Sequence, residues 1–209
     1  FAPNFVFNLV DQREGSTEWD DLSFSLPGHH NVANAMAAIA VAKLLGCTED
    51  KIRQALRTFK GIWRRFEWIY TVPDAVFIDD YAHHPAELQA AIRAARSLFP
   101  GRKLTGVFQP HLYSRTNDFA DGFASSLEAL DEVILLDIYP AREEPMEGVN
   151  SEMIATKMKH PNVVVMHKNK LIDELKNREI DVLMTLGAGD IGALVPEIAT
   201  TLFEVEKTS

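Results

Sequence analysis

The chain has 209 residues, of which 46% are hydrophobic and 24% charged, and its formal net charge is −9. This length and composition suffice for one large or two small soluble domains with buried cores. The negative charge argues against nucleic acid or an anionic membrane as the main partner. A single cysteine, Cys47, excludes an intrachain disulfide framework and favours a reducing, cytoplasmic compartment. The longest apolar stretch, residues 33–45, is too short to span a bilayer.

The first segment predicts a hairpin followed by two helices. Apolar residues alternate at positions 5, 7 and 9 and again at 22, 24 and 26, on either side of the turn-rich stretch 11–17, which is typical of a β-hairpin. Pro27 and Gly28 end the hairpin, and an alanine-rich helix is expected from about Asn31 to Leu45. A second helix should follow Thr48 and run to Phe59. We place a domain boundary near residue 65.

Beyond this boundary, strand-like and helix-like segments alternate. Strands are expected at 75–78, 104–108, 132–136, 163–166 and 181–186, and helices at 85–98, 119–130, 151–158, 171–176 and 191–203. Such βα units predict an α/β fold with a mostly parallel sheet and helices on both of its faces. Residues 1–65 and 66–209 are therefore treated as separate domains.

Four of the strands end in clusters of charged, histidine or glycine residues. The clusters occupy residues 79–85, 109–115, 137–144 and 187–190. In an open parallel sheet, ligands bind beyond the carboxyl ends of the strands. All four clusters should therefore meet at one edge of the sheet, and this edge is the predicted functional site.

The first cluster reads Asp79-Asp80-Tyr81-Ala82-His83-His84-Pro85. Side chains alternate along a strand, so Asp79 and Asp80 should face opposite ways and not form a carboxylate pair. We expect one of them to hold the loop or cap the next helix while the other faces a ligand. His83 and His84 should also diverge, which argues against a joint metal site. For any single residue of this cluster, helix capping is an equal alternative to ligand binding.

Three arginines are candidate anion-binding groups. Arg115 ends the second cluster, and its guanidinium suits a carboxylate or a phosphate. Arg64 and Arg65 lie at the domain boundary between Trp63 and Phe66. These aromatic flanks predict an anchored backbone and at least one guanidinium aimed at the site. A surface salt bridge is the alternative for Arg115, and a solvated pair of side chains is the alternative for Arg64 and Arg65.

Gly187 to Gly192 match the pattern G-x-G-x-x-G between a strand and a helix, which is the dinucleotide fingerprint. In that fingerprint an acidic residue follows on a second strand, whereas here only one helix follows. Glycines that permit a tight turn and close helix packing are therefore preferred to a nicotinamide site.

Asn31 and Asn34 share one face at the start of the alanine-rich helix. Their amides offer both donors and acceptors, which suits the edge of an adenine ring. Helix capping is the alternative for Asn31 but does not require Asn34.

Taken together, these motifs resemble the Mur ligases. They are, in order, His30-Asn31-x-x-Asn34, Arg64-Arg65-Phe66, Asp79 to Pro85, Gln109-Pro110-His111-Leu112-Tyr113-Ser114-Arg115-Thr116 and Gly187-Ala188-Gly189-Asp190. Five motifs in order over nearly the whole chain make the resemblance specific. It implies that residues 1–65 are the end of a central ATPase domain and that 66–209 form a Rossmann-like, amino-acid-binding domain. The sequence has no G-x-x-x-x-G-K-[ST] loop, so it resembles a C-terminal fragment that is inactive alone.

The resemblance also implies roles for individual residues. Asn31 and Asn34 would contact the adenine of ATP, and Asp80 its ribose. Arg65 would contact the ATP phosphates and be the catalytic cation. The amino-acid pocket would be lined by Tyr81, His83, His111 and Arg115. Some relatives carry a second arginine where this chain has Leu112, which leaves the number of cations on the amino-acid carboxylate open.

The implied reaction belongs to peptidoglycan synthesis in the cytoplasm. ATP would activate the carboxylate of UDP-N-acetylmuramate as an acyl phosphate, releasing ADP, and the amine of L-alanine would displace phosphate. The magnesium ligands would lie outside this chain, and we predict no metal site within it. Three alternatives remain at this point: a sibling ligase that attaches murein tripeptide, a nicotinamide oxidoreductase, and a non-catalytic nucleotide-binding module.

Overall fold

A computed structural model describes residues 5–11 and 17–203. These residues form two compact units, which divide between Ile62 and Trp63. The division lies three residues before the boundary expected at 65, because Arg64 and its neighbours are bonded into the second unit. The predicted turn at 12–16 lies outside the described residues, as does the tail beyond Phe203.

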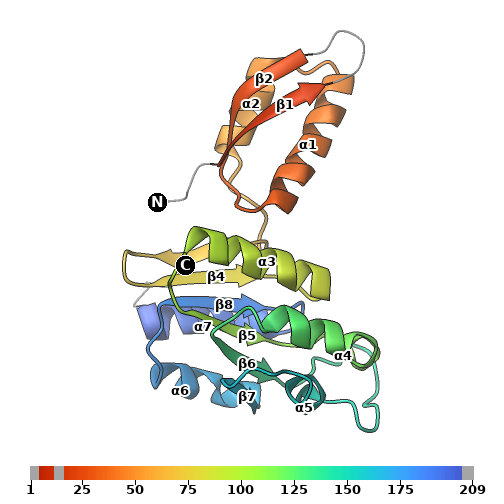
Figure 1. Cartoon of the computed structure of the whole chain (residues 1–209), viewed down its shortest axis with the longest axis vertical. Coiled ribbons are helices and arrows are strands. Elements are labelled where there is room, and N and C mark those ends of the chain that lie inside the picture. Colours follow the sequence, from red (N-terminus) through yellow and green to blue (C-terminus); the bar gives the residue numbers. More distant parts are fainter. Residues whose placement is uncertain (1–4, 12–16, 204–209) are drawn as a thin grey trace. The chain divides into compact units, whose positions relative to one another are not determined.

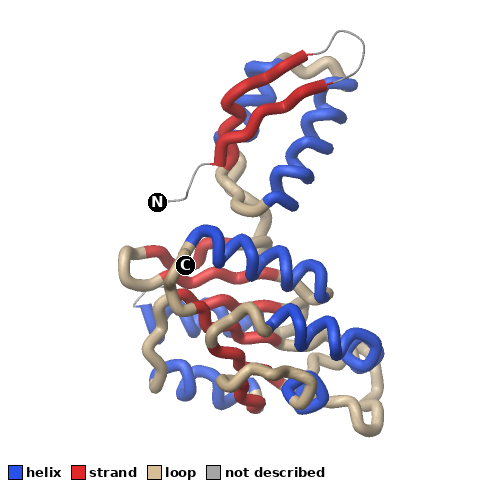
Figure 2. Tube along the Cα trace, in the orientation of Figure 1, coloured by secondary structure: helices blue, strands red, loops and turns tan. Residues whose placement is uncertain are grey.

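The first unit is a hairpin covered by two helices (Figures 1 and 2). Strands β1 (Phe5–Asp11) and β2 (Thr17–Phe24) pair antiparallel, with a bulge between Phe7 and Leu9. Helices α1 (His29–Leu44) and α2 (Glu49–Thr58) follow. One face of the hairpin packs on the helices to form a small core: Leu9, Trp19, Leu22, Phe24, Leu26, Ala35, Ile39, Ile52 and Leu56. The alternation of apolar residues predicted this hairpin correctly, and α1 begins two residues earlier than expected.

The second unit is an α/β fold around a six-stranded sheet (Figure 1). Its strands are β3 (Glu67–Thr71), β4 (Val76–Asp80), β5 (Leu104–Phe108), β6 (Glu132–Leu136), β7 (Val163–Met166) and β8 (Val182–Leu186). The strand order is β3-β4-β8-β5-β6-β7, and every pair is parallel except β3 with β4. The predicted mostly parallel sheet is confirmed. The antiparallel edge strand β3 was not predicted, because its residues directly follow the boundary motif.

Helices cover both faces of this sheet (Figure 2). They are α3 (Pro85–Leu98), α4 (Tyr113–Leu127), α5 (Ser151–Ala155), α6 (Leu171–Lys176) and α7 (Ile191–Phe203), with a 3₁₀ turn at Lys168–Lys170. Helices α3, α4 and α5 share one core with the sheet, and α6 and α7 share the other. Alternate residues of each buried strand enter opposite cores, as Ile78 and Phe77 do in β4.

Strands β5 and β8 approach closely at their carboxyl ends. Gly187 follows β8 with a φ of 134°, and a Cβ atom there would lie 2.5 Å from the carbonyl oxygen of Gln109. Gly187 donates its N–H to the carbonyl of Asp80 on the other side. Both the positive φ and the backbone contact require glycine at this position.

We predict that Gly187→Ala destabilises the fold far more than Gly101→Ala. Gly101 also has a positive φ, 77°, but nothing lies within 4 Å of its Cβ position. Both variants carry backbone strain of about 1 kcal/mol, and only Gly187→Ala adds an overpacking cost of roughly 1–3 kcal/mol. Urea denaturation followed by circular dichroism measures the difference. Equal losses for the two variants would contradict the close approach.

Candidate functional site

The four predicted clusters meet at one edge of the sheet in the second unit. Tyr81 and His83 follow β4, His111 follows β5, and Tyr139 follows β6. Their rings form a chain, with centroid separations of 5.4 Å for Tyr81–His83, 6.3 Å for His83–His111 and 5.6 Å for His111–Tyr139. His111 and Tyr139 also form an isolated parallel bridge beyond the ends of their strands. The expectation of a shared edge is therefore confirmed.

The neighbouring histidines diverge, as expected. The Nδ1 of His83 lies 3.0 Å from the carbonyl oxygen of Tyr81 and 3.1 Å from a carboxylate oxygen of Glu87. His84 instead caps α3, because its Nδ1 accepts a hydrogen bond from the Ala86 N–H, and its ring packs against Phe119. Helix capping is thus the role of His84, while His83 stays at the edge of the sheet.

Helix α4 begins earlier than the sequence pattern indicated. We expected its start at Phe119, but the helix begins at Tyr113, and Phe119 only marks a kink with a φ of −119°. Glu143 accepts hydrogen bonds from the backbone N–H and the hydroxyl of Ser114, at 2.9 and 2.5 Å. These bonds from Ser114 lower the pKa of Glu143. The start of this helix depends on a residue 29 positions away, which local periodicity could not reveal.

Arg115 lies in the first turn of α4 rather than in the loop where we expected it. Its guanidinium lies 3.3 Å from the Nδ1 of His111. Partial burial lowers the pKa of His111, and the positive charges of Arg115 and His83 lower it further, against a smaller opposite effect of Glu143. Burial and the fixed cation of Arg115 therefore both disfavour the charged form of His111.

Asp79 and Asp80 face opposite ways, as their places in a strand predicted. Asp79 accepts hydrogen bonds from Arg64 at 2.8 Å and from the Thr185 hydroxyl at 2.6 Å. Asp80 accepts from the backbone N–H groups of Phe66 and Ala82, both at 2.7 Å. Burial raises the pKa of Asp80 to about 6, although the two N–H groups limit the rise.

Both carboxylates thus hold the backbone together, and Asp80 is the one that ties down the loop after β4. Each Asp80 oxygen already accepts a backbone hydrogen bond. A contact of Asp80 with the ATP ribose therefore stays a prediction, which would use lone pairs that these bonds leave.

Arg64, and not Arg65, is the buried arginine of the boundary motif. Its side chain is 6% exposed, and it donates to Asp79 and, at 2.7 Å, to the carbonyl of Gly187. The flanking residues differ from each other, since Phe66 is buried whereas Trp63 is 78% exposed. Trp63 is therefore not the anchor that we expected. One aimed guanidinium is present, and it binds the protein itself.

Arg65 reaches the site from the same segment. Its side chain is 43% exposed, lies 3.5 Å from a carboxylate oxygen of Glu87 and approaches the Tyr81 ring to 5.4 Å. Although partial burial of Glu87 acts in the opposite direction, the His83 N–H and the charges of His83 and Arg65 lower the pKa of Glu87. Arg65 is thus held near the histidines while its guanidinium remains accessible.

The glycine loop after β8 is filled by neighbouring residues. A Cβ atom on Gly189 would lie 2.3 Å from the amide oxygen of Gln109 and 2.7 Å from the Cβ of Tyr139. Gln109 also donates to Asp190 at 2.7 Å and accepts from the Ile191 N–H at 2.8 Å. This packing favours the preferred interpretation of tight turns and close contacts. It leaves no cradle for a dinucleotide pyrophosphate at these glycines, which argues against the oxidoreductase alternative.

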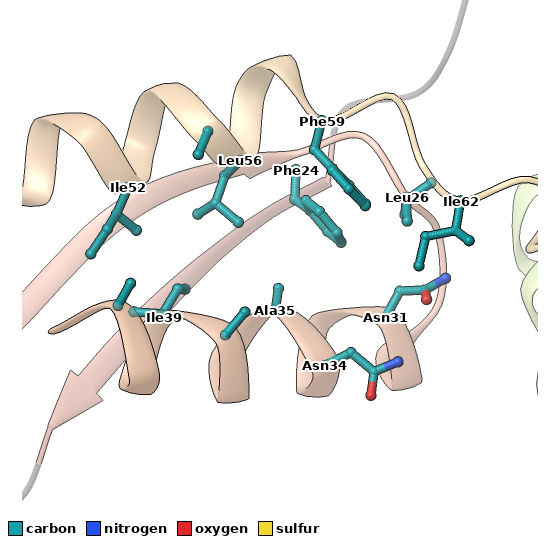
Figure 3. Close-up of a pocket in the computed structure, with 13 residues that line it drawn as sticks. Phe24, Leu26, Asn31, Asn34, Ala35, Ile39, Ile52, Leu56, Phe59 and Ile62 are labelled. Carbon is teal, nitrogen blue, oxygen red and sulfur yellow. The ribbon is translucent and has the colours of Figure 1, made fainter. Parts of the chain in front are cut away.

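The first unit contains an apolar cavity of about 360 Å³ (Figure 3). Asn31 and Asn34 lie at one end of its lining, beside Leu26 and Ile62, while the rest is aliphatic and aromatic. The Asn31 amide donates to the Pro27 carbonyl at 2.7 Å, and Gly28 is the N-cap, so Asn31 does not cap α1. The two amides share one face, as predicted, and their contact with adenine stays a prediction.

Sequence reasoning assigned no role to several residues that shape the site. Gln109, Tyr139 and Glu143 lie within the predicted clusters, but the sequence did not show which residues they contact. Glu87 lies four residues after His83, a helical spacing that could have signalled the pair.

Within residues 5–11 and 17–203, no group of three or more His, Cys, Asp or Glu side chains is placed to hold a metal ion, so we assign no metal-binding role to them. In the same part of the chain, no helix is both long and apolar enough to cross a membrane.

Comparisons with known proteins define the class. Residues 64–189 match the family model "Mur ligase, glutamate ligase domain". The match covers more than half of the chain and spans the strand-end site. This chain belongs to the Mur ligase family.

Individual proteins resemble this chain over most of its length. The UDP-N-acetylmuramate–L-alanine ligase of Flavobacterium johnsoniae is 50% identical over 96% of this chain, and the enzyme of that name from Porphyromonas gingivalis is 51% identical over 84%. Among solved structures, UDP-N-acetylmuramate–alanine ligase of Thermotoga maritima is 30% identical, with a TM-score of 0.72 over 87% of this chain. A murein peptide ligase of Psychrobacter arcticus shares the fold, at 24% identity and a TM-score of 0.64. The chain spans 44% of the Flavobacterium relative, 39% of the Porphyromonas relative and 39% of the Thermotoga structure.

We predict that Asp79→Ala lowers the free energy of unfolding by about 3–5 kcal/mol, because Arg64 would be left as a buried, unpaired charge. The double variant Arg64→Met with Asp79→Leu should be more stable than Asp79→Ala, since no charge remains buried. Asp173→Ala is the control, because its exposed pair with Lys176 should contribute little. Urea denaturation compares the three. If Asp79→Ala behaves like Asp173→Ala, the buried pair is not structurally important.

Proposed function

We propose that this chain is the C-terminal part of an ADP-forming ligase that joins L-alanine to UDP-N-acetylmuramate in the cytoplasm, a step of peptidoglycan synthesis. The observation that carries the proposal is the group of Tyr81, His83, His111 and Arg115 at one sheet edge. The names of the relatives at 50% identity supply the substrates. The murein tripeptide alternative is less favoured, because the relative of that type is only 24% identical.

Each unit would contribute residues that bind substrate. In the first unit, the end of the central ATPase domain, Asn31 and Asn34 would hold the adenine of ATP. In the second unit, Asp80 would accept hydrogen bonds from the ribose, and Arg65 would meet the phosphates. Arg115 would bind the carboxylate of L-alanine, beside the rings of Tyr81, His83 and His111.

The proposed reaction has two steps. The muramate carboxylate attacks the γ-phosphate of ATP, giving an acyl phosphate and ADP. The alanine amine then attacks the acyl carbon, and phosphate leaves. Phosphoryl transfer depends mainly on positioning and on the stabilisation of charge, so the accessible cation of Arg65 is suited to the first step. Magnesium, bound by residues outside this chain, would neutralise phosphate charge.

We predict that the 209-residue chain has no ligase or ATPase activity by itself. A P-loop supplies the backbone and the lysine that hold ATP phosphates, and this sequence contains none. A longer protein that includes the upstream portion spanned by the relatives should be active. Both are assayed with ATP, magnesium, UDP-N-acetylmuramate and L-alanine. Comparable turnover by the two proteins would overturn the proposed division of labour.

Two arginine variants of the longer protein should separate the two substrates. Arg115→Ala should raise the KM for L-alanine roughly ten- to a hundredfold, because a charge-assisted bond of about 1.5–3 kcal/mol is lost, and leave the KM for ATP unchanged. Arg65→Ala should lower kcat instead, without raising the KM for L-alanine. Steady-state kinetics with each substrate varied measures both.

Arg102→Ala is the matched control, since Arg102 pairs with Asp181 at the opposite ends of the strands. It should change neither KM. If Arg115→Ala raises the KM values for L-alanine and ATP equally, Arg115 does not bind the L-alanine carboxylate. If Arg65→Ala changes only the KM for L-alanine, Arg65 does not act on the phosphates.

A further inference from the structure

The contacts of the two histidines of the site imply opposite proton positions. The Nδ1 of His83 faces the Tyr81 carbonyl at 3.0 Å and the Glu87 carboxylate at 3.1 Å. Both partners only accept hydrogen bonds, so this nitrogen must carry the hydrogen. In the neutral ring of His83, the lone pair is then on Nε2.

His111 has the reverse arrangement. Its Nδ1 lies 3.3 Å from a guanidinium nitrogen of Arg115. A guanidinium donates hydrogen bonds and cannot accept them, so Nδ1 of His111 must be the acceptor. The hydrogen of the neutral ring is then on Nε2. The site thus presents one imidazole with an accepting Nε2 and one with a donating Nε2, their ring centres 6.3 Å apart.

The same local arrangement occurs twice in the fold and accounts for the different hydrogen positions of the two rings. Each histidine lies two residues before a helix, α3 or α4, and each is paired with the third residue of that helix. For His83 the paired residue is the negatively charged Glu87, and for His111 it is the positively charged Arg115. The same spacing with opposite charge therefore sets opposite tautomers.

We propose that Nε2 of His83 is the base that takes a proton from the ammonium group of the incoming amino acid, and that Nε2–H of His111 donates a hydrogen bond to the oxygen of the acyl group under attack. This proposal rests on the proposed function. It concerns only the second step, because a free amino acid carries an ammonium group at neutral pH and must lose a proton to become a nucleophile.

One ammonium proton moves to Nε2 of His83, and the freed electron pair on nitrogen forms the C–N bond. The carbonyl electrons move to oxygen, which accepts the hydrogen bond from His111. They return as the bond between the acyl carbon and the bridging oxygen breaks, and phosphate leaves with the second amine proton. His83 then returns its proton to water.

The surrounding charges favour this assignment over the reverse. A protonated His83 would be stabilised by Glu87 and by the Tyr81 carbonyl. Protonation of His111 on Nδ1 would break its bond to Arg115 and place two positive charges 3.3 Å apart. Among the described residues, the charged or titratable groups that face the two rings are Arg65, Tyr81, Glu87, Arg115, Tyr139 and Glu143.

The tautomers can be tested on the 209-residue chain itself, without any activity. Two-bond ¹H–¹⁵N correlation spectra at about pH 8, above the ordinary imidazole pKa of about 6.5, distinguish the two neutral forms. We expect hydrogen on Nδ1 for His83 and on Nε2 for His111, with His83→Gln and His111→Gln used to assign the signals. The same tautomer in both rings, or the reverse pair, would overturn the proposal.

Catalysis is tested in the longer protein with His83→Gln. Loss of a general base typically costs a factor of 10²–10⁴, so kcat for ligation should fall by about 100-fold or more. Because a general base shapes the pH dependence of the rate, the pH–rate profile of His83→Gln should also differ from that of the unaltered protein. His84→Asn is the matched control, because asparagine preserves the helix cap and His84 faces Phe119. Its rate and pH profile should match the unaltered protein.

Trapping of the intermediate separates the two proposals. Hydroxylamine is largely unprotonated at neutral pH and needs no base, so His83→Gln should still yield the muramyl hydroxamate at the unaltered rate. No hydroxamate from the unaltered longer protein would refute the proposed function. Suppose instead that the unaltered longer protein forms hydroxamate. If His83→Gln then ligates L-alanine at the normal rate, or forms no hydroxamate, only the role of His83 is refuted.

Discussion

The buried pair of Arg64 and Asp79 holds the functional edge of the sheet together. The two side chains, 6% and 2% exposed, meet at 2.8 Å, and Arg64 also binds the carbonyl of Gly187. One guanidinium thus connects the segment before β3, the end of β4 and the loop after β8. Removing charge from water is costly, and a buried pair offsets that cost only when its hydrogen bonds are satisfied. Here Thr185 supplies a further bond to Asp79.

The same interaction also occupies the glycine loop after β8. With Gly187 bound to Arg64 and crowded by Gln109, the glycine loop is occupied by protein atoms. In a dinucleotide-binding fold, this place would face the pyrophosphate. The accessible groups lie instead beyond the ends of β4 and β5, with the two histidines in the loops and Arg115 in the first turn of α4. A Rossmann-like sheet thereby presents polar side chains rather than glycine backbone at its edge.

The sequence predicted the sheet, most helix bounds and the shared edge, because these follow from periodicity and from the rule for parallel strands. Non-local bonds account for what the sequence did not reveal. The start of α4, which was predicted wrongly, depends on Glu143, and the choice of Arg64 as the buried arginine, which the sequence left open, depends on Asp79. The exposure of Trp63 could not be inferred either, since an aromatic residue beside a buried one gives no sign of which faces the core.

The early start of α4 has a chemical consequence. If Arg115 were in a loop, no fixed spacing would bring it to His111, and the ring could adopt either tautomer. Within the first helical turn, Arg115 lies four residues after His111, just as Glu87 lies four residues after His83. The charge of one residue in each helix then decides which ring nitrogen holds hydrogen. Helix starts after β4 and β5 therefore set the protonation pattern of the site, and not only the positions of its side chains.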